Sequence, residues 1–99
     1  MFHHAVLFRL REGVTLDRVR RARKALAELA ETLPGCLHFA VCDNLSGENR
    51  GYTLALFATF ESRKAYEIYS RHPEVQRVQA EFAPVVTERI VAEGEGSPE

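Results

Sequence analysis

Residues 52–60 read YTLALFATF, and this stretch decides the fold because it is rich in β-forming residues and apolar on two sides. Alternate residues of a strand point to opposite faces of its sheet. One face of this strand carries Leu54, Leu56, Ala58 and Phe60, and the other carries Thr53, Ala55, Phe57 and Thr59. Neither set is strongly polar, so both faces of the predicted strand need a cover.

Three further strands and two helical units are predicted around this stretch. The strands span 2–10, 36–43 and 87–93, and the helical units span 16–33 and 62–82. Pro34-Gly35 ends the first helical unit, and Pro73 is placed to begin a new helix within the second. The order β-α-β-β-α-β is typical of α+β, ferredoxin-like folds, with a four-stranded antiparallel sheet and the helices on one face. Residues 94–99, GEGSPE, are predicted to form a disordered polar tail.

The first strand has the same two-sided character as residues 52–60. One face carries His4, Val6, Phe8 and Leu10, and the other carries His3, Ala5, Leu7 and Arg9. Because the helices cover only one face, we expect a second copy of the chain to cover the other, which gives a homodimer joined sheet to sheet. A chain of 99 residues also has a small core when it folds alone. The alternative is a monomer with a partly apolar sheet surface.

Charge and composition narrow the classes of partner. Thirteen Lys and Arg residues against fourteen Asp and Glu residues give a net charge of −1, which argues against nucleic acid and anionic membranes as partners. The basic run at 18–24 is interpreted as a solvated helix face. No apolar run approaches the roughly 20 residues of a membrane span. The N-terminus does not resemble a signal peptide, so a cytoplasmic protein is expected.

Cys36 and Cys42 lie about 20 Å apart if one strand holds both, at about 3.3 Å per residue, so two free thiols are expected. His38 is expected to share a face with Cys36, but two ligands alone do not make a metal site. We therefore expect no metal and no cofactor.

Several short motifs, in this order, resemble the stress-responsive α/β-barrel (Dabb) domain family. They are HAVLFRLREGV at 4–14, LPG at 33–35, GYTLAL at 51–56, FES at 60–62, YSRHPEV at 69–75, PVV at 84–86 and RIV at 89–91. The resemblance implies one Dabb domain over residues 1–93 and a dimeric α+β barrel, in which two sheets face each other with the helices outside. It also implies a small-molecule pocket between the sheet and the helices of each subunit.

The family's plant polyketide cyclases, which close a ring without a cofactor, are matched only in part. The resemblance places their pocket histidine at His4, their tyrosine at Tyr69 and the first histidine of their His-Pro motif at His72. Three further polar positions of the cyclase pattern are occupied by Leu26, Leu54 and Val75. The losses fall on acid/base groups and argue against the cyclase reaction itself.

Candidate site residues are drawn from strand alternation and from this resemblance. His4 is expected to point toward the helices, where it could accept a proton from carbon next to a carbonyl, contact a ligand, or serve only as a buried hydrogen-bonding residue. Tyr69 is a candidate hydrogen-bond donor, and His72 is interpreted either as a helix cap or as a pocket residue. Leu26, Leu54, Leu56 and Val75 would give the pocket an apolar lining.

The sequence leaves three functions open. The first is a homodimeric binding protein for a small, largely apolar molecule, with a stress-related role implied by the resemblance alone. The second is a cofactor-free lyase, isomerase or cyclase that uses His4 as base and Tyr69 as donor. The third, similar to haem-handling and quinone-forming monooxygenases of the same barrel type, lacks a convincing haem ligand in this sequence.

Overall fold

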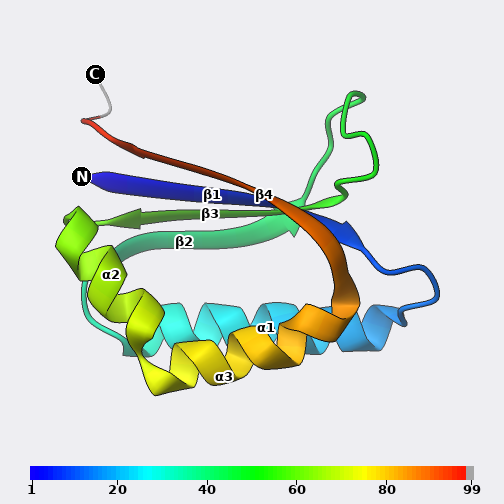
Figure 1. Cartoon of the computed structure of the whole chain (residues 1–99), viewed down its shortest axis with the longest axis horizontal. Coiled ribbons are helices and arrows are strands. Elements are labelled where there is room, and N and C mark those ends of the chain that lie inside the picture. The colour runs from blue at the N-terminus through cyan, green and yellow to red at the C-terminus, as the bar shows by residue number, and fades with distance from the viewer. Residues whose placement is uncertain (98–99) are drawn as a thin grey trace.

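The computed structural model describes residues 1–97, which form one antiparallel sheet with helices on one face (Figure 1). The strands are β1 (Phe2–Leu10), β2 (Cys36–Asp43), β3 (Leu54–Phe60) and β4 (Val86–Glu95), in the spatial order β2-β3-β1-β4. The helices are α1 (Leu16–Thr32), α2 (Arg63–Arg71), α3 (Pro73–Phe82) and the short 3-10 helix η1 (Ala83–Val85). The ferredoxin-like architecture predicted from the sequence is confirmed.

Side-chain caps mark the starts of α1 and α2. The Thr15 hydroxyl accepts a hydrogen bond from the Arg18 amide at 3.3 Å, and the Ser62 hydroxyl accepts one from the Ala65 amide at 3.1 Å. Gly35 follows α1 with a φ of +92°, and a side chain there would meet the Cβ atom of Ala65 at 3.2 Å. A glycine is therefore needed both to turn the chain and to let α2 approach β2.

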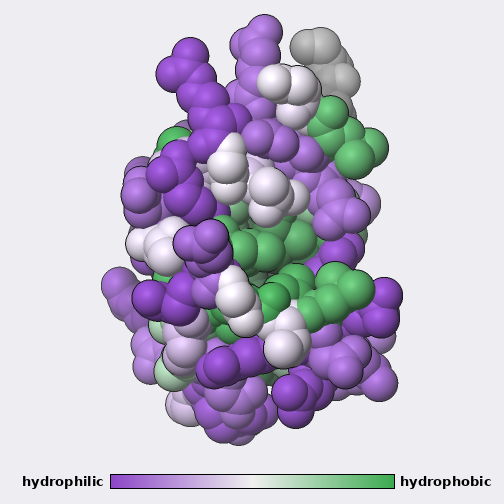
Figure 2. Space-filling model, turned by 90° about the vertical axis from the view of Figure 1, so that its right-hand side faces the viewer, coloured by the Kyte–Doolittle hydropathy of each residue, from purple (hydrophilic) through white to green (hydrophobic). Residues whose placement is uncertain are grey.

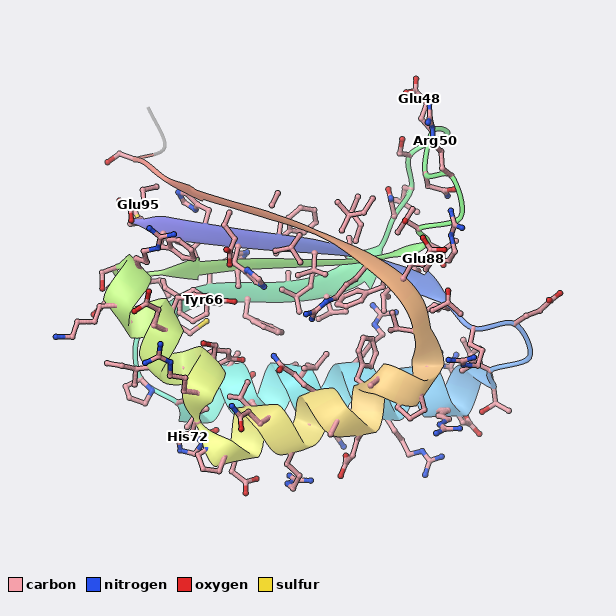
Figure 3. All side chains as sticks on the ribbon, viewed as in Figure 1. Glu48, Arg50, Tyr66, His72, Glu88 and Glu95 are labelled. Atoms are coloured by element: carbon pink, nitrogen blue, oxygen red, sulfur yellow. The ribbon has the colours of Figure 1, made fainter. Side chains whose placement is uncertain are left out.

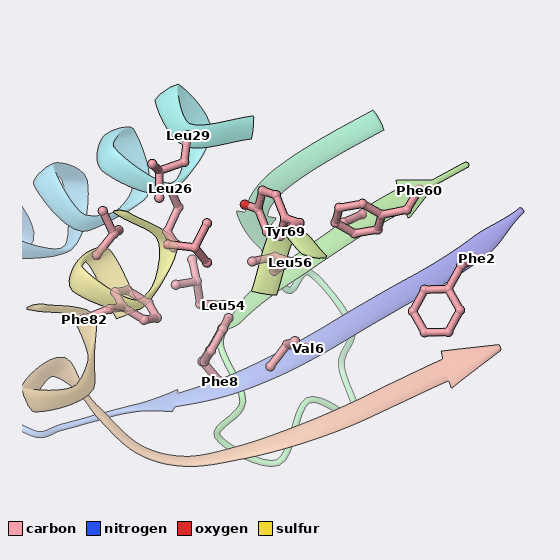
Figure 4. Packing of buried hydrophobic residues seen from close by; sticks show 13 residues of the cluster. Phe2, Val6, Phe8, Leu26, Leu29, Leu54, Leu56, Phe60, Tyr69 and Phe82 are labelled. Carbon is pink, nitrogen blue, oxygen red and sulfur yellow. The ribbon is translucent and has the colours of Figure 1, made fainter. Parts of the chain in front are cut away.

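The core lies between the sheet and the helices, and its strand residues are those of the helix-facing set (Figure 4). Its most deeply buried large side chains are Leu54, Phe60, Val75 and Val85. Aromatic contacts link the layers, since Phe8 meets Phe82 edge to face at 5.0 Å between ring centroids. The predicted alternation of β1 and β3 is thus confirmed.

The opposite side of the sheet, here called the outer face, has no cover from the described residues of the chain. The register places Ala5 and Leu7 of β1 beside Phe57 and Ala55 of β3, and beside Ala92 and Ile90 of β4. Phe57 is 47% exposed and Ile90 is 49% exposed. The outer face is therefore an apolar surface, as the two-sided strands predict.

Three strand boundaries differ from the prediction, namely the start of β3 and both ends of β4, which spans Val86–Glu95 rather than 87–93. β3 begins at Leu54 rather than at residue 52, because the backbone of Tyr52 and Thr53 bonds to Asn44 and Asn49 of the connecting loop. β4 continues through Gly94 and Glu95, which we expected in a disordered tail, and the Gly96 amide then donates to the Met1 carbonyl at 3.0 Å. The predicted tail is therefore wrong at its start, and its last two residues, 98–99, lie outside the described part of the chain.

A β-bulge changes the facing of residues at the start of β2. The register shifts between Cys36 and His38, so that Cys36 pairs with Phe60 of the core-facing set whereas His38 pairs with Thr59 of the outer face. The expectation that Cys36 and His38 share a face is therefore wrong. A bulge inserts one residue into the alternation and reverses the facing of the strand residues beyond it.

Candidate functional site

A cleft opens between the sheet and the helices on the side of β1 and β4. Its volume is about 420 Å³. Figure 2 shows an end view of the molecule in which hydrophobic side chains reach the surface within a hydrophilic surround. The lining residues come from β1, α1, β3, α3, η1 and β4: His4, Val6, Phe8, Leu26, Leu56, Gln79, Phe82, Ala83, Val86, Thr87, Glu88 and Arg89.

A smaller inner cavity of about 40 Å³ adjoins this cleft. His4, Leu26, Leu56 and Gln79 line both spaces, so these residues mark the boundary between them. The inner cavity adds residues from β2, β3, α2 and α3: Phe39, Ala58, Phe60, Tyr66, Tyr69, Ser70 and Val75. The site is thus a mostly apolar cleft that narrows toward tyrosine side chains.

The structure brings most of the predicted site residues together. His4, Leu26 and Leu56 line both spaces, and Tyr69 and Val75 line the inner cavity. Leu54 instead lies in the core, only 1% exposed, and lines neither space.

His72 also lines neither space and lies at the corner between α2 and α3 (Figure 3). Its Nδ1 accepts a hydrogen bond from the Glu74 amide at 3.1 Å. It therefore caps α3, which is one of the two interpretations drawn from the sequence.

His4 has a polar partner, Glu93, that no local sequence pattern indicates. Its Nδ1 lies 2.8 Å from Oε2 of Glu93, and the two side chains are 15% and 35% exposed. Glu93 is the residue directly opposite His4 in the β1–β4 ladder. In a β-α-β-β-α-β fold the first and last strands are neighbours, so their register was the signal that could have found this pair.

Tyr66 packs against the same histidine from α2. Its ring lies 4.8 Å from the His4 ring at an interplanar angle of 31°, and 5.0 Å from the Phe2 ring at 27°. Figure 3 shows the Tyr66 side chain on the helix side of the sheet. His4 is therefore held between an aromatic ring and a carboxylate.

Both tyrosines keep their protons at neutral pH. Burial is the main cause that raises the pKa of Tyr69 to about 12, and the negative charges that Cys36 and Tyr66 carry when ionised raise it further. Burial, followed by the negative charge of Glu93, also raises the pKa of Tyr66. Neither phenol can act as a base near pH 7, but either hydroxyl can donate a hydrogen bond.

The described residues offer little for metal chemistry. Within residues 1–97, no three His, Cys, Asp or Glu side chains gather in a way that could hold a metal ion. Burial raises the pKa of the Cys36 thiol, which disfavours the thiolate that binds metals. None of the helices of this part of the chain is long and apolar enough to cross a membrane.

Sheet topology, one-sided helices and a cleft between the layers together define a ferredoxin-like α+β domain with a pocket on its helix side. The family model of the stress responsive A/B barrel domain matches residues 2–95, and the chain belongs to this family. The match includes the end of β4, two residues beyond the boundary predicted at 93.

Solved structures of similar proteins agree with this assignment. A dimeric ferredoxin-like protein of unknown function from Thermobifida fusca is 26% identical, with a TM-score of 0.82, over 94% of this chain and 88% of that one. A Dabb family protein from Mesorhizobium loti is 20% identical, with a TM-score of 0.83, over 97% and 96% of the two chains.

The hydroxynitrile lyase from Passiflora edulis is 17% identical, with a TM-score of 0.89, over 99% and 94%. Because the Mesorhizobium loti and Passiflora edulis proteins are only 20% and 17% identical to this chain, their similarity supports the fold and nothing about function. No match was found among curated proteins.

Proposed function

We propose that the protein binds a small, largely apolar molecule in the cleft between the sheet and the helices. One observation carries this proposal: a cleft of about 420 Å³ has a mostly apolar lining and leads past His4 into the smaller inner cavity. Such a lining with few polar groups is typical of small-molecule sites. The Tyr69 hydroxyl of the inner cavity adds a donor for a carbonyl or similar acceptor.

We also propose that the working form is a homodimer in which two outer faces meet. The exposed side chains of Phe57 and Ile90 support this, because apolar surface of this kind is favourably buried against a second copy. The Thermobifida fusca protein of the same fold is described as dimeric. The free thiols of Cys36 and Cys42 suit the cytoplasm, where thiols stay reduced.

The binding proposal is tested with prodan, a neutral naphthyl ketone whose fluorescence reports an apolar environment. Gln79 lies at the boundary of both spaces, so Gln79→Trp narrows the passage and should weaken prodan binding about tenfold or more. Gln76→Trp is the matched control, because Gln76 is exposed on the same helix and lines neither space. Equal prodan affinity in both variants, or no binding to the unmodified protein, would contradict the proposal.

A second candidate function is proton transfer at carbon without a cofactor. The contact between His4 and Glu93 favours it, since a carboxylate partner stabilises the imidazolium that forms when His4 takes up a proton. A ketone carbonyl could meanwhile accept a hydrogen bond from Tyr69.

This second function is tested with 2-tetralone in deuterated water, where exchange of the protons next to the carbonyl is followed by NMR. We expect the protein to accelerate exchange and His4→Gln to reduce that acceleration by about 100-fold or more, as for loss of a general base. His3→Gln is the control, because His3 lies on the outer face and bonds to Thr59 and Gly96. Catalysis that survives His4→Gln excludes His4 as the base.

A further inference from the structure

The hydrogen bond between His4 and Glu93 restricts which nitrogen of the imidazole carries a proton. The two residues are directly opposite in the β1–β4 ladder, and Nδ1 lies 2.8 Å from Oε2. An ionised carboxylate can only accept hydrogen bonds. A hydrogen bond at this distance therefore requires the proton of a neutral His4 to sit on Nδ1.

Packing keeps the ring in this orientation. Tyr66 lies over the His4 ring at 4.8 Å, and Phe2 stacks on Tyr66 at 5.0 Å. A 180° flip of the ring would put Cδ2 in the place of Nδ1 and would therefore break the bond to Glu93 within this stack. Nδ1 consequently stays with Glu93.

The other nitrogen is left for a ligand. Among residues 1–97, the hydrogen bond found for the His4 side chain is the one from Nδ1 to Glu93, so Nε2 is without a partner there. His4 lines both the cleft and the inner cavity. A neutral ring that is protonated at Nδ1 presents a lone pair at Nε2, which accepts a hydrogen bond and cannot donate one.

We propose that Glu93 is a positioning residue that fixes His4 as the Nδ1–H tautomer, so that the cleft prefers apolar molecules carrying a hydroxyl group. This inference rests on the proposed binding function and names the class of its ligand. Leu26, Leu56 and Ala58, which line the inner cavity with His4, carry no hydrogen-bonding side chain, whereas Gln79 at the same boundary has an amide that can donate as well as accept. A ligand without a donor leaves Nε2 desolvated and unpaired, which costs affinity.

Two probes of nearly the same shape test the preference. 2-Naphthol carries a hydroxyl where 2-methoxynaphthalene carries a methyl ether, and fluorescence titration gives a dissociation constant for each. The unmodified protein should bind 2-naphthol about tenfold more tightly, and Glu93→Ala should bring the ratio of the two constants close to one. Glu95→Ala is the matched control, since Glu95 lies two residues further along β4, is exposed, and should leave the ratio unchanged.

A second readout needs no ligand. Long-range ¹H–¹⁵N correlation spectra of the neutral imidazole distinguish the two tautomers directly. The unmodified protein should show His4 protonated at Nδ1, and Glu93→Ala should shift the population toward Nε2, whereas a merely structural role for Glu93 would leave the tautomer unchanged.

The possible results separate the two proposals. If neither naphthalene binds but the Nδ1–H tautomer is present and depends on Glu93, the binding function fails and the positioning role stands. A His4 found protonated at Nε2 in the unmodified protein overturns the inference, as does a preference for 2-naphthol that persists in Glu93→Ala.

Discussion

At the scale of single residues, strand alternation correctly predicts on which side of the sheet a side chain lies, but it does not predict how deeply that side chain is buried. It correctly places His4, Leu54 and Leu56 on the helix side of the sheet. It does not tell that Leu54 lies beside Phe8 in the β1–β3 ladder, where Phe82 closes the end of the core. Leu54 is 1% exposed and lines neither cavity, whereas Leu56 is 7% exposed and lines both, a difference in depth that alternation does not predict.

Glu93 was not predicted as a site residue, because no local sequence pattern around it suggests a site. Its role depends on the pairing of two strands whose facing residues are 89 positions apart in the sequence. The register of that pair was within reach of sequence reasoning once the fold class was predicted. The distance of 2.8 Å and the packing of Tyr66 were not.

The raised pKa of Tyr69 predicts a stability effect at high pH. Burial raises the pKa of the Tyr69 phenol from its ordinary value of 10 to about 12 in the folded protein. The free energy of unfolding is therefore unaffected by this group below pH 10 and falls as the pH rises from 10 to 12, because the phenol loses its proton first in the unfolded chain. Urea unfolding at pH 8 and pH 11 should show about 1 kcal/mol more loss of unfolding free energy for the unmodified protein than for Tyr69→Phe. An equal loss in both proteins would show that Tyr69 titrates normally.

At the scale of elements, the sequence predicts every strand and every long helix, but not the irregularities that connect them. The start of α3 at Pro73 was visible in the sequence as proline at the first helical position. The bulge after Cys36 was not, since no residue type there demands it. The extension of β4 depends on pairing with β1, which a stretch of glycine and glutamate does not reveal.

The cap on α3 gives a prediction at this scale. The His72 ring accepts the Glu74 amide proton, so His72→Ala should lower the free energy of unfolding by about 1 kcal/mol, whereas His72→Asn keeps an acceptor and should lose less. Urea unfolding measures both. Prodan affinity should be the same in both variants, because His72 lines neither cavity. A loss of prodan affinity at unchanged stability would instead assign His72 to the ligand.

At the scale of the whole molecule, the helices stabilise one face of a sheet that is apolar on both. The outer face arises from small and large apolar residues in register across three strands, including Leu7, Ala55 and Ile90. That pattern was legible in the sequence for β1 and β3, because each of these two strands carries apolar residues on both faces. The volume of the cleft could not be predicted from the sequence, since it depends on how α3, η1 and the start of β4 are placed relative to β1.

A charge on the outer face should separate the proposed dimer. Phe57→Asp places a carboxylate among apolar side chains that would be buried on association, so sedimentation equilibrium at micromolar concentration should give 11.2 kDa for this variant and twice that mass for the unmodified protein. Ile68→Asp is the control, because Ile68 is 64% exposed on α2, away from the outer face. A mass of 11.2 kDa for the unmodified protein would refute the dimer.

The bulge in β2 has a consequence for the chemistry of the two cysteines. It turns Cys36 toward Phe60 and the helices, while Cys42, paired with Ala55, emerges on the opposite side of the sheet. Cys36 consequently packs against the core, whereas Cys42 lies on the outer face, which the proposed dimer would bury. A maleimide reagent should therefore alkylate Cys42 only in dissociated subunits, so the rate of alkylation would report the rate at which the dimer dissociates.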